Sequence, residues 1–216
     1  MISGKPEHFS RREFARSAGM LAVAGVFAPE SQSLNPFSPP AVKKITIRNV
    51  SSNFEREPLN PYRFKGSAIT DSWQAIAMME SDSGIRKIGL GTQGVLWSGS
   101  KVFAAHSESA GNALMYAMSE RALQMIKGTS FNDPVQLLND ILPEVLAYGK
   151  KITGNPDLRK TFALNALVCV DNAAWLLYAQ ENGMKQFDEM VPAAYRPGLS
   201  YRHEKVASIP SFAVGT

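Results

Sequence analysis

The sequence is poor in the residues that most often carry enzyme chemistry. Its single cysteine, Cys169, excludes an intramolecular disulfide and lies in an apolar run, where a free thiol packs as a small buried side chain. His8, His106 and His203 are far apart, with no cysteine or carboxylate pair at metal-ligand spacing beside them. No Walker loop, G-x-S-x-G or H-x-x-x-H motif is present. The residues alone therefore predict no catalytic group and no metal site in this chain.

The overall composition is that of an ordinary soluble globular protein. The 216 residues are 44% hydrophobic and carry a formal net charge of +4. The length suits one domain with a core, or one domain plus extensions. The excess basic residues cluster near the start and again in residues 43–65, without a continuous basic stripe and interleaved aromatic residues. This distribution argues against nucleic-acid binding.

The first residues have the pattern of a targeting segment. The stretch Ser10-Arg-Arg-Glu-Phe14 precedes an apolar segment, residues 17–28, that is too short for a membrane span of roughly 20 residues. Because of the pair Arg11 and Arg12, it resembles the twin-arginine export signal of bacteria. We therefore predict an export signal over residues 1–28 and a periplasmic protein, membrane-anchored if the signal stays uncleaved. An ordinary amphipathic N-terminal helix is the alternative.

A proline- and serine-rich linker and three strands are predicted next. Residues 29–42 have linker composition. Residues 44–50 alternate apolar and polar side chains, and residues 73–79 and 85–90 are the next strand candidates, joined by turn chemistry at Ser81-Asp-Ser-Gly84. Asn53 to Gly66 contains two prolines and no periodicity, so we predict a loop there. The result is a three-stranded antiparallel meander.

A G-x-G-x-x-G pattern follows, formed by Gly89, Gly91 and Gly94. In a dinucleotide fingerprint these glycines open a helix directly, whose N-terminus faces the pyrophosphate. Here they lead into Val95–Ser100, which has little helical character, and the preceding strand is paired by a hairpin rather than a crossover helix. We therefore predict that the glycines let a strand end and bend into a long loop.

The rest of the chain is predicted to be helical. A buried apolar stripe predicts a helix from residue 106 or 107 to 127. Asp133 and the proline after it predict a second helix to about Tyr148, kinked or broken by Pro143. A third helix, from Asn155-Pro156 to Gly183, is apolar nearly all round and should lie at the centre of the fold. The predicted fold class is α+β, a meander followed by a bundle of three to four helices.

Few polar side chains stand out as functional candidates. Asp171 is alone in the most apolar helix, where it is expected to bond a backbone amide or pair with Arg159 or Arg202. Glu80 and Asp82 flank the hairpin and are expected to be solvated. The two predicted loops carry side chains that could contact an anionic substrate, although plain exposed loop residues are the alternative; these are Phe54, Arg56, Tyr62, Arg63, Trp97 and Lys101.

The third helix carries a recognisable pattern. Ala166-Leu-Val-Cys-Val-Asp-Asn-Ala-Ala-Trp175, with the following residues 177–183, resembles the A-x-D-x-A-x-W-D-x-x-A-x-x-x-G helix of the enolase superfamily, in its mandelate racemase and muconate lactonising branch. The order of elements is similar to the N-terminal capping domain of that family. Residues 43–191 would be the cap, and 192–216 the connection and the start of the first barrel strand. Leu176 departs from the usual acidic residue, and Gly91-Thr92 departs from a common Gly-Glu.

The resemblance implies that the catalytic machinery lies outside this sequence. In the family a (β/α) barrel supplies lysines and three carboxylates that hold Mg²⁺, which stabilises the enolate formed when the proton next to a carboxylate is removed. No residue here matches those groups, so the resemblance implies that this chain binds no metal and is inactive alone. The missing barrel would be its partner, a small carboxylate its substrate, and homo-oligomers are possible.

The resemblance also assigns a role to the two predicted loops. The complete enzyme would be a racemase, epimerase or dehydratase, and its cap would select the substrate through Asn53–Lys65 and Gly91–His106, with the glycines as a lid hinge. The alternative is a free-standing exported α+β module that binds a ligand or another protein without any barrel.

Overall fold

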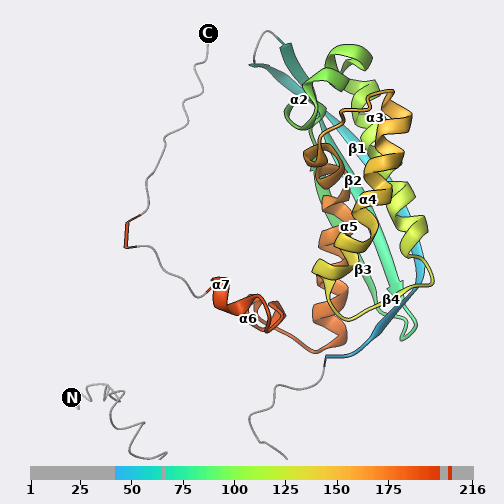
Figure 1. Cartoon of the computed structure of the whole chain (residues 1–216), viewed down its shortest axis with the longest axis vertical. Helices are drawn as coiled ribbons and strands as arrows, with labels where there is room; N and C mark the ends of the chain where they lie inside the picture. Colours follow the sequence, from blue (N-terminus) through green and yellow to red (C-terminus); the bar gives the residue numbers. More distant parts are fainter. Residues whose placement is uncertain (1–41, 65–66, 200–203, 206–216) are drawn as a thin grey trace, which may run out of the picture. The chain divides into compact units, whose positions relative to one another are not determined.

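The computed structural model describes residues 42–64, 67–199 and 204–205. The predicted export signal with Arg11 and Arg12, and also Arg202, lie outside these residues. The described part has the predicted α+β architecture, a sheet followed by helices (Figure 1).

The sheet is antiparallel and has the strand order β3-β2-β1-β4. Its strands are β1 (Ile45–Phe64), β2 (Ser67–Ser81), β3 (Arg86–Gln93) and β4 (Ser130–Phe131). The predicted three-stranded meander is confirmed, and its turn is closed by Gly84 at a φ of 86°. The short strand β4 is an addition that pairs only with the first two residues of β1.

The long loop predicted after residue 53 is wrong. β1 continues to Phe64 and pairs with β2 along almost its whole length, despite Pro58 and Pro61. β4 borders only the start of β1, so the outer edge of the rest of β1 has no neighbouring strand within the described residues. A proline whose nitrogen faces such an edge removes no hydrogen bond between strands. The register shifts between Pro58 and Tyr62, an irregularity that contains the second proline.

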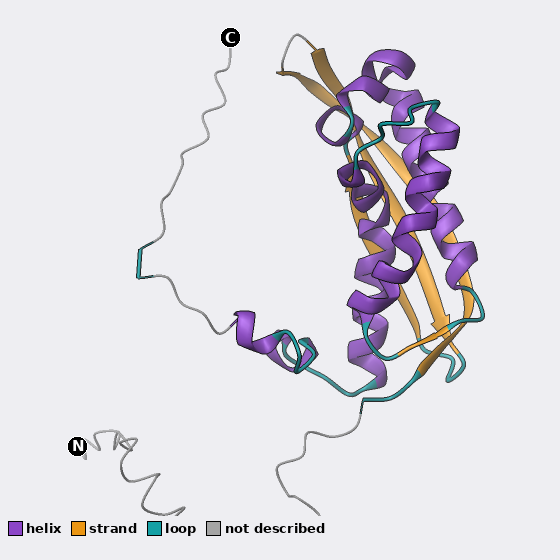
Figure 2. Ribbon diagram, viewed as in Figure 1, coloured by secondary structure: helices purple, strands orange, loops and turns teal. Residues whose placement is uncertain are grey.

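Helices cover one face of this sheet (Figures 1 and 2). The helices α3 and α5 pack on the strands, and α4 packs on these two helices. The buried side chains between sheet and helices form one hydrophobic core. The helices are α2 (Val95–Ser98), α3 (Ser100–Ile126), α4 (Pro134–Thr153), α5 (Lys160–Glu181), α6 (Phe187–Met190) and α7 (Arg196–Leu199).

Several predicted helix boundaries need correction. The predicted loop over Gly91–His106 is wrong, because β3, α2 and the first turns of α3 occupy it. The expected start near residue 107 is instead a break inside α3, where Ser107 has a φ of 71°. Asp133 caps α4 as predicted, but the helix continues through the exposed Pro143 to Thr153. An exposed proline is tolerated there because water can solvate the carbonyl that loses its backbone partner.

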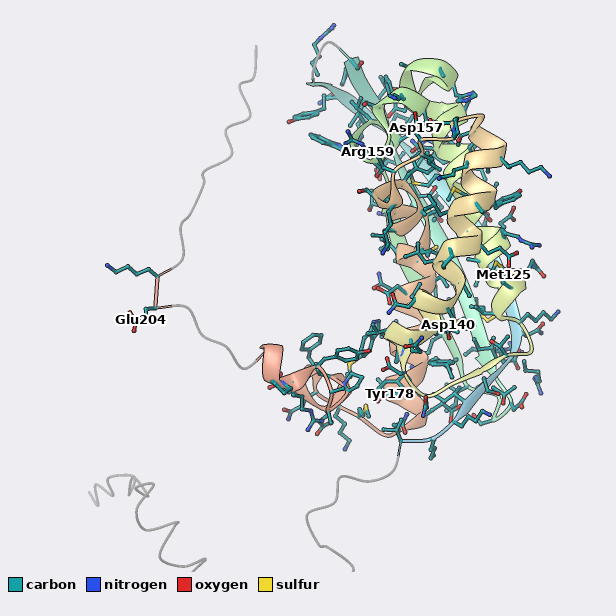
Figure 3. All side chains as sticks on the ribbon, in the orientation of Figure 1. Met125, Asp140, Asp157, Arg159, Tyr178 and Glu204 are labelled. Carbon is teal, nitrogen blue, oxygen red and sulfur yellow. The ribbon has the colours of Figure 1, made fainter. Side chains whose placement is uncertain are left out.

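The central helix starts later than predicted, and it is buried on the side that packs in the core while Leu164 and Leu176 on it are exposed. α5 begins at Lys160 rather than at the Asn155-Pro156 pair, which instead forms a turn closed by the Leu158 N–H bond to the Asn155 carbonyl. By length and composition alone α5 could cross a membrane, but 56% of its most apolar window is buried in this fold, as in a core helix. Tyr178 near its end is 1% exposed (Figure 3). Cys169 is buried as predicted, and burial raises the pKa of its thiol.

Two glycines of the G-x-G-x-x-G pattern lie inside β3 and not in a loop. A Cβ added at Gly89 would lie 2.1 Å from the carbonyl oxygen of Cys169, and one at Gly91 would lie 2.7 Å from the amide nitrogen of Cys169. Both positions therefore let the backbone of α5 rest directly on the strand. The prediction that the glycines end a strand and form a lid hinge is therefore wrong for Gly89 and Gly91. Gly94, in contrast, lies at the junction of β3 and α2.

Glu80 was expected to be solvated, and this is wrong. It is 2% exposed, and Arg48 and Arg86 bind its carboxylate. Burial by itself would raise the pKa of Glu80, but hydrogen bonds and charge from the two guanidinium groups outweigh it and lower the pKa. Asp82 is exposed, as predicted.

Candidate functional site

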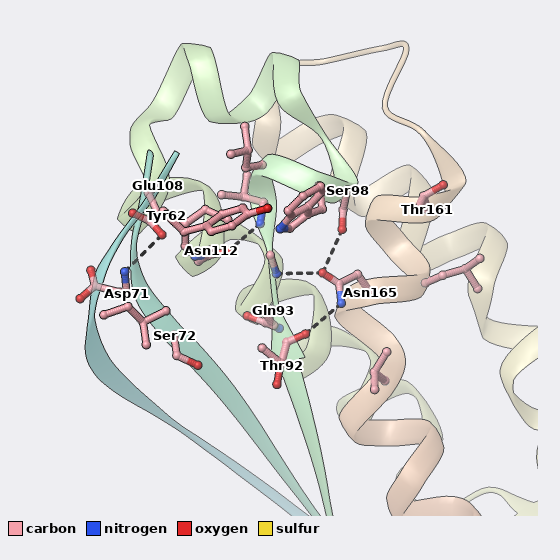
Figure 4. Close-up of a pocket in the computed structure, with 18 residues that line it drawn as sticks. Tyr62, Asp71, Ser72, Thr92, Gln93, Ser98, Glu108, Asn112, Thr161 and Asn165 are labelled. Atoms are coloured by element: carbon pink, nitrogen blue, oxygen red, sulfur yellow. Dashed lines mark hydrogen bonds between the residues drawn. The ribbon is translucent and has the colours of Figure 1, made fainter. Parts of the chain in front are cut away.

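A recess of about 550 Å³ lies where the β1–β2 hairpin meets the corner between β3 and α2 (Figure 4). We call it the hairpin recess. Its lining comes from hairpin residues between Leu59 and Ser72, from residues 92–98, and from α3 and α5. Four segments far apart in the sequence thus meet around one concave surface, the usual form of a small-molecule site.

Two of the predicted site residues meet at this recess. Tyr62 comes from the hairpin and Trp97 from α2, and their ring centroids are 6.3 Å apart. Both rings are about half exposed, Tyr62 at 46% and Trp97 at 55%. A pair of exposed aromatic faces offers a large apolar contact to a ligand at low entropic cost.

Phe54 and Arg56 lie elsewhere on the hairpin, around Trp73. The ring of Phe54 stacks on that of Trp73 with a centroid distance of 5.0 Å. The guanidinium of Arg56 lies 5.0 Å from the Trp73 ring centroid and forms an ion pair of 2.8 Å with Asp71. These contacts join side chains of β1 and β2, and neither Phe54 nor Arg56 lines the hairpin recess.

Arg63 and Lys101 do not line the recess either. Both are exposed, and the Lys101 ammonium is 4.0 Å from the carboxylate of Asp157. Such a solvated pair contributes little to stability. Contact of any of the six predicted residues with an anionic substrate stays a prediction.

Asn165 of α5 fixes the corner that carries Trp97 (Figure 4). Its side-chain oxygen accepts hydrogen bonds from Gly94 N at 3.0 Å and from Ser98 Oγ at 2.9 Å, and its Nδ2 donates to the Thr92 carbonyl at 3.0 Å. One amide therefore holds the end of β3 and both ends of α2. Sequence reasoning missed it, although an asparagine within an apolar helix was a visible signal.

Glu108 anchors the other side of the recess. It directly follows the break at Ser107 and accepts hydrogen bonds from the amide and the hydroxyl of Thr70, at 2.9 and 2.8 Å. This ties the hairpin to α3. Asp71 beside it is paired with Arg56, and no described residue that lines the recess is basic. The recess therefore combines apolar surface with hydroxyl groups and with two carboxylates that are already paired or hydrogen-bonded.

The described residues do not fit a magnesium ion. No three histidine, cysteine, aspartate or glutamate side chains within the described ranges gather closely enough to hold a metal. Mg²⁺ binds through carboxylate oxygens together with water or substrate. We therefore derive no chemical step through a metal held by this part of the chain.

A second groove, of about 730 Å³, lies beside α5 and shares no lining residue with the first. Exposed apolar side chains such as Ile88, Leu90 and Leu176 line it together with Asp171. No ion pair joins Asp171 to Arg159 among the described residues, so that predicted partner is wrong. Burial raises the pKa of Asp171, and a weaker interaction with the Trp175 side chain opposes this.

Replacing Asp171 with asparagine should stabilise the fold at neutral pH. Because the folded state raises this pKa, ionisation destabilises the protein above it, and the penalty vanishes below the ordinary pKa of an aspartate. We expect Asp171→Asn to increase the free energy of unfolding by less than about 1 kcal/mol, since part of the carboxyl is solvated. Urea titrations at neutral and acidic pH measure this. An equal gain at both values, or the same gain in the exposed control Asp82→Asn, would refute it.

Comparison with known proteins gives structural matches only. No protein-family model and no curated protein matches the sequence. Similar solved structures include a dipeptide epimerase from Enterococcus faecalis with Mg and L-Leu-L-Tyr, which is 21% identical with a TM-score of 0.39 and shares 64% of this chain and 32% of its own. An L-talarate/galactarate dehydratase from Salmonella typhimurium is 18% identical, with a TM-score of 0.40 and coverages of 75% and 35%.

A mandelate racemase/muconate lactonizing protein from Herpetosiphon aurantiacus is 14% identical, with a TM-score of 0.38 and coverages of 63% and 31%. The chain thus spans about a third of the length of the structures it matches.

Proposed function

We propose that this chain supplies the substrate-selecting cap of a magnesium-dependent enolase-superfamily enzyme, a racemase, epimerase or dehydratase that removes the proton next to a carboxylate. Its role would be to bind the end of the substrate remote from the reacting carbon. The groups that move the proton and hold the metal would come from a barrel outside the described residues.

The observation that carries this proposal is the position of the family-like helix relative to the two predicted lid segments. The pattern ending at Trp175 and Gly183 lies on α5, the buried helix that rests on β3. The amide of Asn165 on the same helix holds the β3–α2 corner. The segment after β3 and the described hairpin residues around Tyr62 and Ile69 together line the hairpin recess.

Within this proposal, Tyr62 and Trp97 are the residues that contact the substrate. Their support is that both rings line the recess and are exposed enough to be covered by a ligand. Phe54 and Arg56 would act indirectly, by holding the hairpin in shape around Trp73. A cap of this kind gains specificity by excluding water and by matching the remote part of the substrate.

Proton exchange tests the proposal directly. The chain is assayed together with the proposed barrel, whether that barrel continues the same polypeptide or is a separate one, in D₂O with Mg²⁺ and a set of carboxylates, and loss of the α-proton signal is followed by NMR. We expect exchange that needs both the cap and the barrel and stops when a chelator removes the metal. Exchange catalysed by this chain alone would refute the proposal, as would no exchange with any carboxylate by the combined protein.

We also propose that the protein is exported through the paired arginines. The support is the sequence pattern around Arg11 and Arg12 alone. Replacing both arginines by lysine keeps the charge and should abolish the periplasmic fraction of the protein in a bacterial host. An unchanged periplasmic fraction would count against the signal.

A further inference from the structure

One residue that lines the hairpin recess carries a buried polar atom without a partner in the described part of the chain. Gln93, at the end of β3, is 4% exposed and lines the recess. Its Nε2 donates to Ser119 Oγ at 3.1 Å, while its Oε1 is one of two buried side-chain atoms without a partner among the described residues. The other is Trp73 Nε1, on the residue that faces Gln93 across the β2–β3 ladder; no hydrogen bond joins these two side chains within the described ranges, and Trp73 does not line the recess. A buried carbonyl left in this state costs free energy, so it calls for a donor.

The hydrogen-bond network fixes which end of the Gln93 amide is free. Ser119 donates its single hydroxyl proton to the Ala166 carbonyl at 2.6 Å, so its oxygen can only accept from Gln93. The amide must therefore present its NH₂ group to Ser119, and rotating the amide by half a turn would place two acceptors together. The unpaired atom is consequently an oxygen.

The other amide oxygens of the recess are already engaged. Asn165 Oδ1 accepts from Gly94 and Ser98, and Asn112 Oδ1 accepts from Val95 N at 3.0 Å. These bonds hold the corner in place, so they are unavailable to a ligand without loss of structure. Gln93 Oε1 thus differs from these two amide oxygens, because it is buried and accepts no hydrogen bond from a described residue.

The surroundings of Gln93 restrict the kind of donor. The recess is lined by the half-exposed residues Tyr62 and Trp97 and by aliphatic side chains such as Ile69, Leu96 and Leu164. The carboxylates of Asp71 and Glu108 also line it, but Arg56 and Thr70 already engage them, so an entering ammonium group would lose its hydration and compete with these bonds. An uncharged N–H or O–H on an apolar ring loses less on entering and gains the missing bond.

From this arrangement we propose that the hairpin recess binds an uncharged aromatic group that carries one N–H or O–H donor, and that Gln93 Oε1 accepts that hydrogen bond. The inference rests on the proposed function, since it names the class of the remote end of the substrate. Because no described lining residue is basic, the carboxylate of that substrate would lie outside the recess. Gln93 is accordingly a specificity-determining residue, and Tyr62 and Trp97 supply apolar contact without discrimination.

A matched pair of small probes tests this on the whole 216-residue chain. Indole carries the N–H donor, and 1-methylindole has the same ring without it. Ligand-observed NMR titration should show indole binding roughly tenfold more tightly, as expected for one hydrogen bond to a buried acceptor. In Gln93→Leu the two affinities should become equal, whereas the exposed-glutamine control Gln124→Leu should keep the preference.

A second variant keeps the test decisive if Gln93→Leu fails to fold. Tyr62→Ala removes one exposed wall, so it should weaken both probes by a similar factor and leave their ratio unchanged. Equal binding of the two probes to the wild-type chain, or no binding of either, overturns the proposal. So does a structure in which a buried water bonds Gln93 Oε1 and indole does not displace it. These measurements need no barrel and no turnover, so their failure is separate from failure of the proton-exchange experiment.

Discussion

Gly89→Ala is expected to lower the free energy of unfolding by more than about 3 kcal/mol, beyond the usual range for one added methyl group. The new Cβ would lie 2.1 Å from the carbonyl oxygen of Cys169 and 2.3 Å from the amide nitrogen of Ala173. Both atoms belong to the backbone of α5 and cannot rotate away. The central helix α5 would have to move away from the sheet, which would disrupt its packing against the strands and against α3 and α4.

Two further glycines supply a graded comparison. Gly91→Ala should cost about 2 kcal/mol, because its Cβ would lie 2.7 Å from the Cys169 amide and otherwise meet the Val168 side chain. In Gly84→Ala the new Cβ has no other atom within 4 Å. Only the φ of 86° then makes the substitution unfavourable, by about 1 kcal/mol. Urea unfolding of the three variants measures the series. If Gly89→Ala is no worse than Gly84→Ala, α5 does not rest on β3 as described.

The elements that sequence reasoning predicted well are those whose ends are fixed by neighbouring residues. The tight turn needs a positive φ, which Gly84 supplies within the same four residues. The start of α4 needs an oxygen beside its first amides, and Asp133 supplies it by accepting from Val135 N at 2.8 Å. Such signals require no knowledge of the rest of the fold.

The failures come from contacts between distant segments. Two prolines in the hairpin indicate a loop only if both edges of the strand are paired, and the sequence does not say that β4 stops beside Thr46. Gly89 and Gly91 indicate a bend only if nothing lies against them, and α5 arrives there from about eighty residues further along the chain. Glu80 was placed in solvent because Arg48 and Arg86 flank it only once the sheet has formed.

The residues of the candidate site also divide into those that the sequence indicates and those whose role depends on contacts between distant segments. Tyr62 and Trp97 could be named from residue type alone, since aromatic side chains in polar segments commonly contact ligands. Asn165 was visible as an asparagine within an apolar helix, but its partners, like those of Gln93, depend on contacts with distant segments. The Nδ2 group of Asn165 bonds the Thr92 carbonyl, 73 residues away in the sequence, and no local pattern reveals such a pair.

Asn165→Ala is expected to cost about 2 kcal/mol of stability and to loosen the recess as well. The change leaves the Gly94 amide, the Ser98 hydroxyl and the Thr92 carbonyl without their shared partner. Free energies of unfolding measure the first effect. Hydrogen exchange of the amides of α2 measures the second, because α2 is a single turn and depends on this side chain for support at both ends.

The matched control is Asn172, which lies on the same helix. Its Nδ2 makes one hydrogen bond, of 2.7 Å, to the Leu90 carbonyl, and its side chain is exposed, so Asn172→Ala should cost less than about 1 kcal/mol. It should also leave exchange in α2 unchanged, since it bonds β3 before the corner. Faster exchange in α2 for Asn165→Ala alone would show that one side-chain amide of α5 holds the turn that carries Trp97. Equal behaviour of the two variants would mean that α2 is held by the Val95–Asn112 bond instead.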